Sequence, residues 1–194
     1  MASGEGRAQP TAYSLQPKVK SGPIDSGNTK GLAGVMLLIV WHSRTGAARA
    51  MAEAAFEGAR GAGEALLLPA GEAGPEHLLA AKGYLFACPE NLASMSGAMK
   101  EFFDRCYYPV LGRIEGRAYA TLIAAGSDGS GAQTQIDRIA TGWRLRRVAE
   151  PLIVNTAAQT PEAILAAKVV PPGSLRQCHE LGAALGEGLG LGIY

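Results

Sequence analysis

The stretch that decides the fold runs from Met36 to Ala52 and reads MLLIVWHSRTGAARAMA. Its apolar run, Met36–Trp41, ends at a short loop with hydroxyls and a glycine, and a helix-forming run begins at Ala47 without a gap. A continuous apolar run is typical of a parallel strand covered on both faces. The N–H groups of such a loop and the positive end of the helix dipole point to one place. The stretch therefore predicts a strand, an anion-binding loop and a helix in direct succession.

The same alternation of short apolar segments and longer helical segments continues to the end of the chain. The pattern predicts further strands at Glu64–Pro69, Gly83–Ala87, Ala118–Ala125 and Val148–Val154. It predicts helices at Ala47–Arg60, Ser96–Tyr107, Ala132–Trp143 and Ser174–Leu189. Strands that alternate with helices form right-handed βαβ units and a parallel sheet. We therefore expect a doubly wound α/β domain with helices on both faces of the sheet.

Composition excludes several classes of function. The chain has 194 residues, 47% of them hydrophobic, and a formal net charge of +1, which is typical of one globular domain. A near-neutral charge gives no reason to expect a nucleic-acid or membrane-surface partner. No apolar run is long enough for insertion into a membrane. The three widely spaced cysteines match neither a disulfide framework nor a metal site, so we expect reduced thiols, a cytoplasmic location and no metal.

Residues 1–33 differ from the rest of the chain, because Gly, Ser, Pro, Gln and Lys dominate and no hydrophobic period is present. We expect them to form a flexible or non-native extension, with the domain at residues 34–194 and its natural beginning near Met36. The alternative is an arm that packs on a partner subunit.

Three loops that follow predicted strands are rich in small and hydroxyl-bearing residues: His42–Ala48, Pro89–Gly97 and Gly126–Gly131. Ligands of open α/β sheets bind beyond the carboxyl ends of the strands, so we expect these loops to lie together. In the first loop, Ser43 and Thr45 offer hydroxyl groups to a phosphate. The position of the loops at successive strand ends predicts a binding site for a flat, phosphate-bearing ligand.

Each loop also has a purely structural interpretation. Thr45 and Ser96 are typical helix-capping residues, and Gly46 is typical of a tight turn. The first loop lacks the Gly-Lys-Ser/Thr triplet of a nucleotide loop, and the glycine pattern of a dinucleotide fingerprint is absent, so a monophosphate fits best. No G-x-S-x-G elbow is present, which excludes that class of serine hydrolase.

From Met36 onward the chain resembles the flavodoxin-like, NAD(P)H-dependent FMN oxidoreductases, including quinone reductases of the tryptophan-repressor-binding-protein type. The resemblance rests on residues 43–46, 89–97 and 126–133. It implies a five-stranded parallel sheet of order 2-1-3-4-5 that binds FMN at the ends of strands one, three and four. The implied cofactor contacts are Ser43, Arg44, Thr45, Gly46, Ala47 and Ala48 at the phosphate, Pro89, Glu90, Asn91, Leu92, Ala93, Ser94 and Met95 at the ring, and Gly126, Ser127, Gly129 and Gly131 beside it.

The chain departs from the family pattern in two places. Ala47 and Ala48 stand where many relatives have a hydroxyl or amide side chain, so the phosphate would depend on backbone N–H groups, Ser43 and Thr45. The loop at residues 70–77 lacks the aromatic side chain that covers the flavin in electron-carrier flavodoxins. One flavin face would then stay open for a nicotinamide or a quinone.

The resemblance implies an enzyme in which FMN takes a hydride from NAD(P)H and passes electrons to a quinone, a flavin or another small acceptor. Such chemistry needs no catalytic acid or base from the protein. Relatives suggest a homodimer or homotetramer. The basic cluster at residues 143–147 would either attract the 2′-phosphate of NADPH or lie solvated at a helix end. Two alternatives remain open: a non-enzymatic one-electron carrier flavodoxin, and a flavodoxin-fold domain that has lost FMN.

Overall fold

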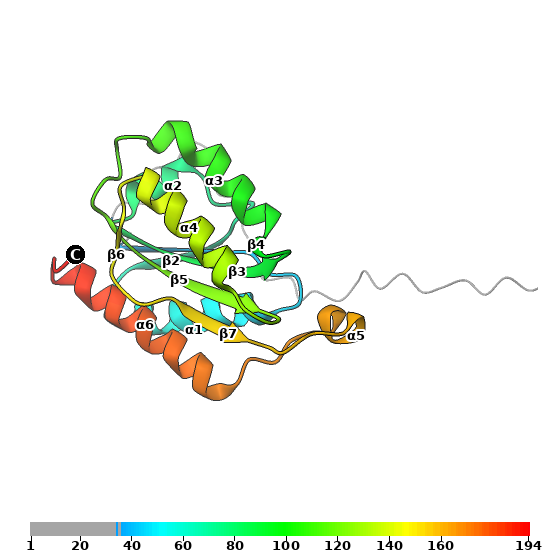
Figure 1. Ribbon diagram of the computed structural model, residues 1–194. Coiled ribbons are helices and arrows are strands. Elements are labelled where there is room, and N and C mark those ends of the chain that lie inside the picture. Colours follow the sequence, from blue (N-terminus) through cyan, green and yellow to red (C-terminus); the bar gives the residue numbers. More distant parts are fainter. Residues whose placement is uncertain (1–33, 35) are drawn as a thin grey trace, which may run out of the picture.

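A parallel β-sheet covered by helices on both faces forms the centre of the protein (Figure 1). The structure, a computed structural model, describes residues 34 and 36–194. The predicted extension at residues 1–33 lies outside the described residues. The strands are β1 (Leu37–Trp41), β2 (Ala65–Pro69), β3 (Gly83–Asn91), β4 (Ser94–Met95), β5 (Ala118–Ala125), β6 (Arg146–Arg147) and β7 (Leu152–Asn155).

The sheet order is β2-β1-β3-β5, and β6 and β7 share the outer position beside β5. This is the expected doubly wound α/β order, but the sheet has seven strands, so the expected five is wrong. The predicted strand Val148–Val154 is divided, since β6 pairs with the start of β5 and β7 with its end. Pro151, between the two parts, has no N–H to donate to a strand ladder. The additional strand β4 pairs antiparallel with the end of β3.

The helices are α1 (Ala47–Ala62), α2 (Pro75–Ala80), α3 (Gly97–Val110), α4 (Ser130–Gly142), α5 (Pro161–Leu165) and α6 (Pro172–Gly190). Figure 1 shows α1 and α6 on one face of the sheet and α2, α3 and α4 on the other. The short helices α2 and α5 had not been predicted. The end at Tyr107 of the helix predicted at Ser96–Tyr107 is also wrong, because α3 includes Pro109 in its last turn. A proline there removes one helical hydrogen bond without ending the helix.

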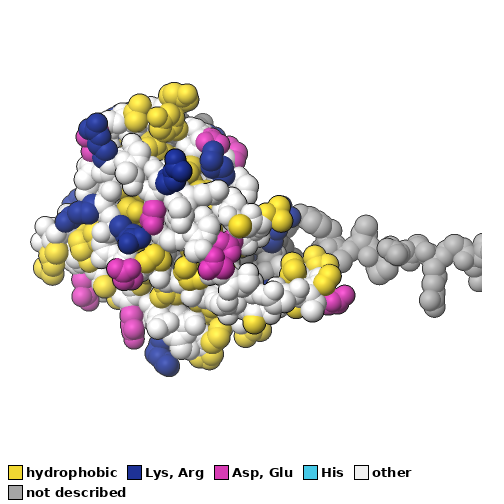
Figure 2. Space-filling view, in the orientation of Figure 1, with side chains coloured by type: hydrophobic (Ala, Val, Ile, Leu, Met, Phe, Trp, Pro, Cys, Tyr) yellow, Lys and Arg dark blue, Asp and Glu magenta, His cyan; other side chains and the backbone are white. Residues whose placement is uncertain are grey.

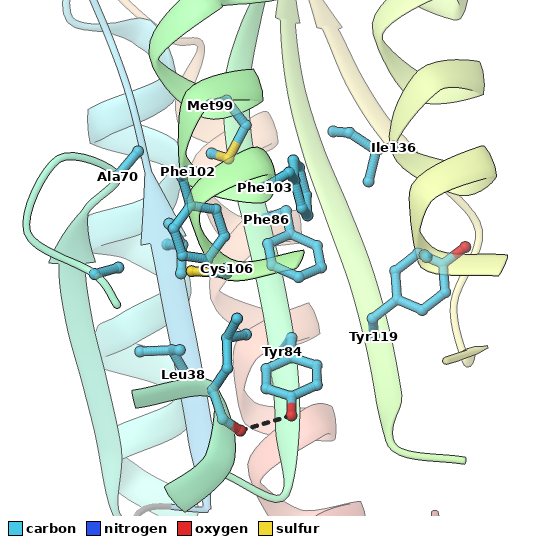
Figure 3. Packing of buried hydrophobic residues seen from close by; sticks show 14 of the residues in the cluster. Leu38, Ala70, Tyr84, Phe86, Met99, Phe102, Phe103, Cys106, Tyr119 and Ile136 are labelled. Carbon is cyan, nitrogen blue, oxygen red and sulfur yellow. Dashed lines mark hydrogen bonds between the residues drawn. The ribbon is translucent and has the colours of Figure 1, made fainter. Parts of the chain in front are cut away.

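The two faces of the sheet have different cores. Beneath α3, Phe86 packs edge-on against Phe103, with ring centroids 5.0 Å apart, among the aromatic and sulfur-containing side chains of Figure 3. Met99, Phe102, Phe103 and Cys106 recur in the sequence at spacings of three and four, which predicts one apolar face for this helix, and all four are buried. Beneath α1 the core is rich in alanine. There the absence of a side chain at Gly58 and Gly182 allows the backbones of α1 and α6 to approach closely.

Strands β1, β3, β5 and β7 run parallel, so the loops that follow them lie at one edge of the sheet. In the part of the chain that the structure describes, no helix has the length and apolar character needed to cross a membrane. The same residues contain no cluster of three or more His, Cys, Asp or Glu side chains suited to a metal ion.

Candidate functional site

The loop after β1 leads directly into the first turn of α1. Gly46 is the N-cap residue and has a φ of 96°, a left-handed conformation that favours glycine. The hydroxyl of Ser43 accepts the Gly46 N–H at 3.0 Å and closes the loop. No side chain caps α1, so the interpretation of Thr45 as a helix cap is wrong.

The N-terminus of α1 keeps its N–H groups available. Within the described residues, no group accepts a hydrogen bond from the N–H groups of Ala47, Ala48 or Arg49. The first turn of α1 has no acidic residue. Ala47 and Ala48 are buried in the core beneath α1, so their side chains add no polar group to the loop. Unpaired N–H groups at the positive end of a sixteen-residue helix are suited to an anion. Arg44 lies exposed in the same loop.

The segment after β7 lies against this loop. Thr45 accepts the backbone N–H of Lys168 at 2.7 Å. The ammonium group of Lys168 donates to the carbonyl of Ile164 at 2.9 Å, at the end of α5. Gln159 donates to the carbonyl of Gly126 at 3.1 Å, so the segment spans the first and third loops. Sequence reasoning missed it, although Thr160 followed by a proline is a helix-start signal.

The second loop is a β-hairpin rather than an irregular connection. Glu90 and Asn91 of β3 pair with Met95 and Ser94 of β4. The two residues of its turn, Leu92 and Ala93, have φ values of 53° and 55°, the left-handed pair of a type I′ hairpin turn. Residues with side chains are strained in this conformation, and the Leu92 side chain is fully exposed.

The Glu90 carboxylate fills the N-terminus of α4. Its oxygens accept the N–H groups of Gly129 at 2.7 Å, Gly131 at 3.0 Å and Ala132 at 3.2 Å. Gly131 lies directly beneath the carbonyl of Ala93, where a Cβ would have no room. The predicted flavin-binding amides of Gly129 and Gly131 are therefore engaged within the protein. The family resemblance implies Glu90 as a ring contact, and no local motif indicates its role at α4.

Further contacts hold the hairpin and the third loop in place. The side-chain oxygen of Gln135 accepts the hydroxyl of Ser94 at 2.7 Å and the N–H of Met95 at 3.2 Å. The carbonyl of Ser127 accepts a hydrogen bond from Asn155. Both the hairpin and residues 126–129 are thus fixed from neighbouring elements.

His42 connects the first loop to the base of the hairpin. Its Nδ1 lies 2.8 Å from the hydroxyl of Ser96, and Ser96 makes no side-chain cap, so that interpretation of Ser96 is wrong. Burial, and to a smaller extent the positive charge of Arg44, lowers the pKa of His42 from its ordinary value. Burial also raises the pKa of the neighbouring Cys88 to about 12, so this thiol stays neutral.

The loop after β2 is held in place by hydrogen bonds from α3. The guanidinium of Arg105 on α3 donates to the carbonyls of Ala73 at 2.7 Å and Ala70 at 2.9 Å. Residues 70–74 carry no aromatic side chain that could cover a ring beside the hairpin.

The basic cluster at residues 143–147 lies at the opposite edge of the sheet. Arg146 and Arg147 pair with Ala118 and Tyr119, at the start of β5, whereas the loops described above follow its end. Arg147 also pairs with Asp137 at 2.9 Å. This position supports a solvated helix end rather than a partner for NADPH. On the face shown in Figure 2, acidic and basic side chains are interspersed.

The parallel sheet and its strand order define a flavodoxin-like fold. Solved structures agree: a flavodoxin from the domain Archaea superimposes with a TM-score of 0.66 and 17% identity, over 80% of this chain and 99% of that one. A flavodiiron protein from Giardia intestinalis gives a TM-score of 0.67 and 18% identity, over 84% of this chain and 38% of that one. These similarities show the fold.

Residues 69–158 match the family model described as NADPH-dependent FMN reductase. A curated protein named flavodoxin, from Aquifex aeolicus (strain VF5), is 33% identical over 107 residues, which are 54% of this chain and 58% of that protein. The match therefore spans just over half of the relative's length. The family match covers fewer than half of the chain's 194 residues, so these matches show a similarity to NADPH-dependent FMN reductases and to a flavodoxin.

Proposed function

We propose that this protein binds FMN at the edge formed by the first loop and the hairpin. There it acts as an oxidoreductase that passes electrons from NAD(P)H to a quinone, a flavin or another small acceptor. The observation that carries the proposal is the N-terminus of α1, whose first N–H groups have no acceptor among the described residues. The matches to FMN reductases and to a flavodoxin support this choice of ligand.

The residues fit the phosphate end of FMN. The N–H groups of Ala47, Ala48 and Arg49 would hold the phosphate, and the exposed Arg44 would add a positive charge beside it. Ser43 would keep the loop closed through its bond to Gly46. The hairpin would border the ring, and the glycine-rich residues 126–129 would lie beside it.

When bound, FMN supplies the ability to accept a hydride and to release electrons. The protein would contribute binding and orientation, with the hairpin held by Glu90 and Gln135. The absence of an aromatic cover at residues 70–74 supports an enzyme, because a nicotinamide or quinone can then stack on the open ring face. The carrier alternative has one observation in its favour, the similarity to a protein named flavodoxin.

The experiment has two stages. Apoprotein is titrated with FMN and with riboflavin, which lacks the phosphate, and flavin fluorescence is measured. We expect FMN to bind more tightly. Protein loaded with FMN is then mixed with NADH or NADPH and a soluble quinone. Steady oxidation of the nicotinamide supports the enzyme, whereas FMN binding without turnover supports a carrier that needs a separate reductase. No binding of FMN contradicts both.

Two further properties follow from this proposal. We propose a cytoplasmic location, which agrees with three buried, unpaired cysteines. We also propose a homodimer or homotetramer, which light scattering of the purified protein would test. Exposed apolar side chains over α5, such as Leu165, are available for subunit contact (Figure 2).

A further inference from the structure

His42 occupies the junction between β1 and the anion loop. Its N–H donates to the carbonyl of Ala87 at 2.9 Å, which extends the pairing of β1 with β3 by one residue. The next residue, Ser43, begins the loop that leads to α1. The half-buried imidazole is therefore fixed at its backbone end, directly beside the predicted phosphate site.

The partner of this imidazole belongs to the hairpin. Ser96 follows β4 directly, is 1% exposed, and lies 54 residues along the chain from His42. Ser96 is the N-cap residue of α3, so its hydroxyl could accept a hydrogen bond from an N–H group of the first helical turn. Instead it lies 2.8 Å from Nδ1 of His42. The choice of partner indicates a specific contact between two loops.

Other contacts of the hairpin lead away from the anion loop. Glu90 connects it to the start of α4, and Ser94 connects it to Gln135 within α4. Within the described residues, the His42–Ser96 hydrogen bond is the only side-chain hydrogen bond between residues 42–46 and residues 89–96. The direct hydrogen bonds between the predicted phosphate and ring contacts are thus those of β1–β3 pairing and this one side-chain bond.

We infer that His42 is a positioning residue for FMN: through Ser96 it holds the anion loop and the hairpin at the spacing that the cofactor needs. This inference rests on the proposed function. A preorganised spacing lets the phosphate and ring contacts form together without a further ordering cost. A ligand without a phosphate engages only the hairpin side and gains nothing from the bond.

Two chemical roles of His42 can be separated by substitution. Asparagine keeps a polar atom attached to Cγ, as Nδ1 is, so His42→Asn retains a partner for Ser96 but has no titratable ring. His42→Ala and Ser96→Ala each remove the hydrogen bond, and the second keeps the imidazole. All measurements are made at about pH 8, above the ordinary imidazole pKa of ~6.5.

The test compares FMN and riboflavin affinities of the wild type, the three variants and the double variant His42→Ala/Ser96→Ala. Loss of one hydrogen bond corresponds to a roughly three- to tenfold weaker FMN affinity for either alanine variant. We expect His42→Asn to bind FMN nearly as the wild type does. The double variant should bind FMN no more weakly than the weaker-binding single variant, because both substitutions remove the same hydrogen bond. Riboflavin affinity should not change.

The control is His179→Ala, at an exposed position on α6, which should leave both affinities unchanged. Circular dichroism checks that each variant is folded. An unchanged FMN affinity in Ser96→Ala overturns the inference, and so does a His42→Asn variant as weak as His42→Ala, since the ring itself would then matter. Equal losses for FMN and riboflavin would show only a weakened hairpin and would also overturn it. A wild type that binds neither flavin refutes the proposed function together with this inference.

Discussion

Helices α1 and α4 begin in nearly the same way but differ in what occupies their N-termini. Each follows a strand of the sheet, and their N-cap glycines, Gly46 and Gly129, have φ values of 96° and 93°. Neither helix has a side-chain cap of its own or an acidic residue in its first turn. At α4 the Glu90 carboxylate accepts three N–H groups, whereas at α1 they stay available. The comparison supports a structural role for the α4 N-terminus and the proposed phosphate site at the α1 N-terminus.

The largest expected effect on stability comes from removing the carboxylate that accepts the N–H groups at the α4 N-terminus. Glu90→Ala leaves three partly buried N–H groups without their charged acceptor, and hydrogen bonds to charged groups contribute about 1.5–3 kcal/mol each, not fully additively. We expect the free energy of unfolding, measured in urea, to fall by about 3 kcal/mol. Glu180→Ala, at an exposed site on α6, is the control and should change it little. A loss below about 1 kcal/mol for Glu90→Ala would remove the distinction between the two helices.

The two N-cap glycines provide a matched pair of substitutions. Alanine at a left-handed φ costs roughly 1–2 kcal/mol at either position. At Gly46 the nearest atom to an added Cβ is the Lys168 carbonyl oxygen at 3.9 Å, whereas at Gly129 it is Cγ2 of Ile153 at 2.5 Å. Gly129→Ala should therefore destabilise the protein by about 1 kcal/mol more than Gly46→Ala. Thermal unfolding of the two variants measures this difference, and equal losses would contradict the packing at α4.

A charge reversal beside the α1 N-terminus should weaken FMN without affecting the fold. We expect Arg44→Glu to lower FMN affinity about tenfold. A surface charge near a helix N-terminus contributes about 0.3–1 kcal/mol to the interaction, and charge reversal removes a favourable contribution and adds an unfavourable one. Riboflavin affinity should stay unchanged. Arg138→Glu, an exposed substitution on α4, is the matched control. An equal effect of both variants would indicate a long-range charge effect instead of a phosphate contact.

The smallest effect is a pH dependence at His42. Its pKa is lowered in the folded protein, chiefly by burial and then by Arg44, so the unfolded chain binds a proton first as the pH falls. The contribution of this histidine to stability is therefore present above about pH 6.5 and is lost as the pH falls from there through the lowered pKa. The free energy of unfolding of His42→Asn should fall less steeply in this window. Parallel slopes for variant and wild type would contradict a buried, neutral imidazole.

The sequence was sufficient for the chain order of the longer strands and helices because their signals are local. The apolar runs at residues 36–41 and 118–125 became β1 and β5, and the spacing of Met99 and Phe103 identified the buried face of α3. The division of the outer strand was harder to predict from the sequence, because β6 and β7 are defined by the part of β5 with which each one pairs.

The candidate site was predictable only in part. Residues 37–48 form a strand, a loop and the start of a helix in one continuous stretch, so the placement of residues 43–48 at a strand end could be expected from the sequence. The bond of Glu90 to Gly129 spans 39 residues, and that of His42 to Ser96 spans 54. Such partners are chosen by tertiary geometry, and no periodicity or local motif records them.

The central claim is that the α1 N-terminus is open because it receives a phosphate. Ser43→Asp tests this most directly, since Ser43 already reaches the Gly46 N–H at 3.0 Å and a carboxylate there would fill α1 as Glu90 fills α4. Flavin titrations compare this variant with the wild type, and Gln177→Glu on α6 is a control for added charge. The account predicts a loss of FMN affinity of about tenfold or more with riboflavin affinity unchanged. Unchanged FMN affinity in a folded Ser43→Asp protein would contradict it.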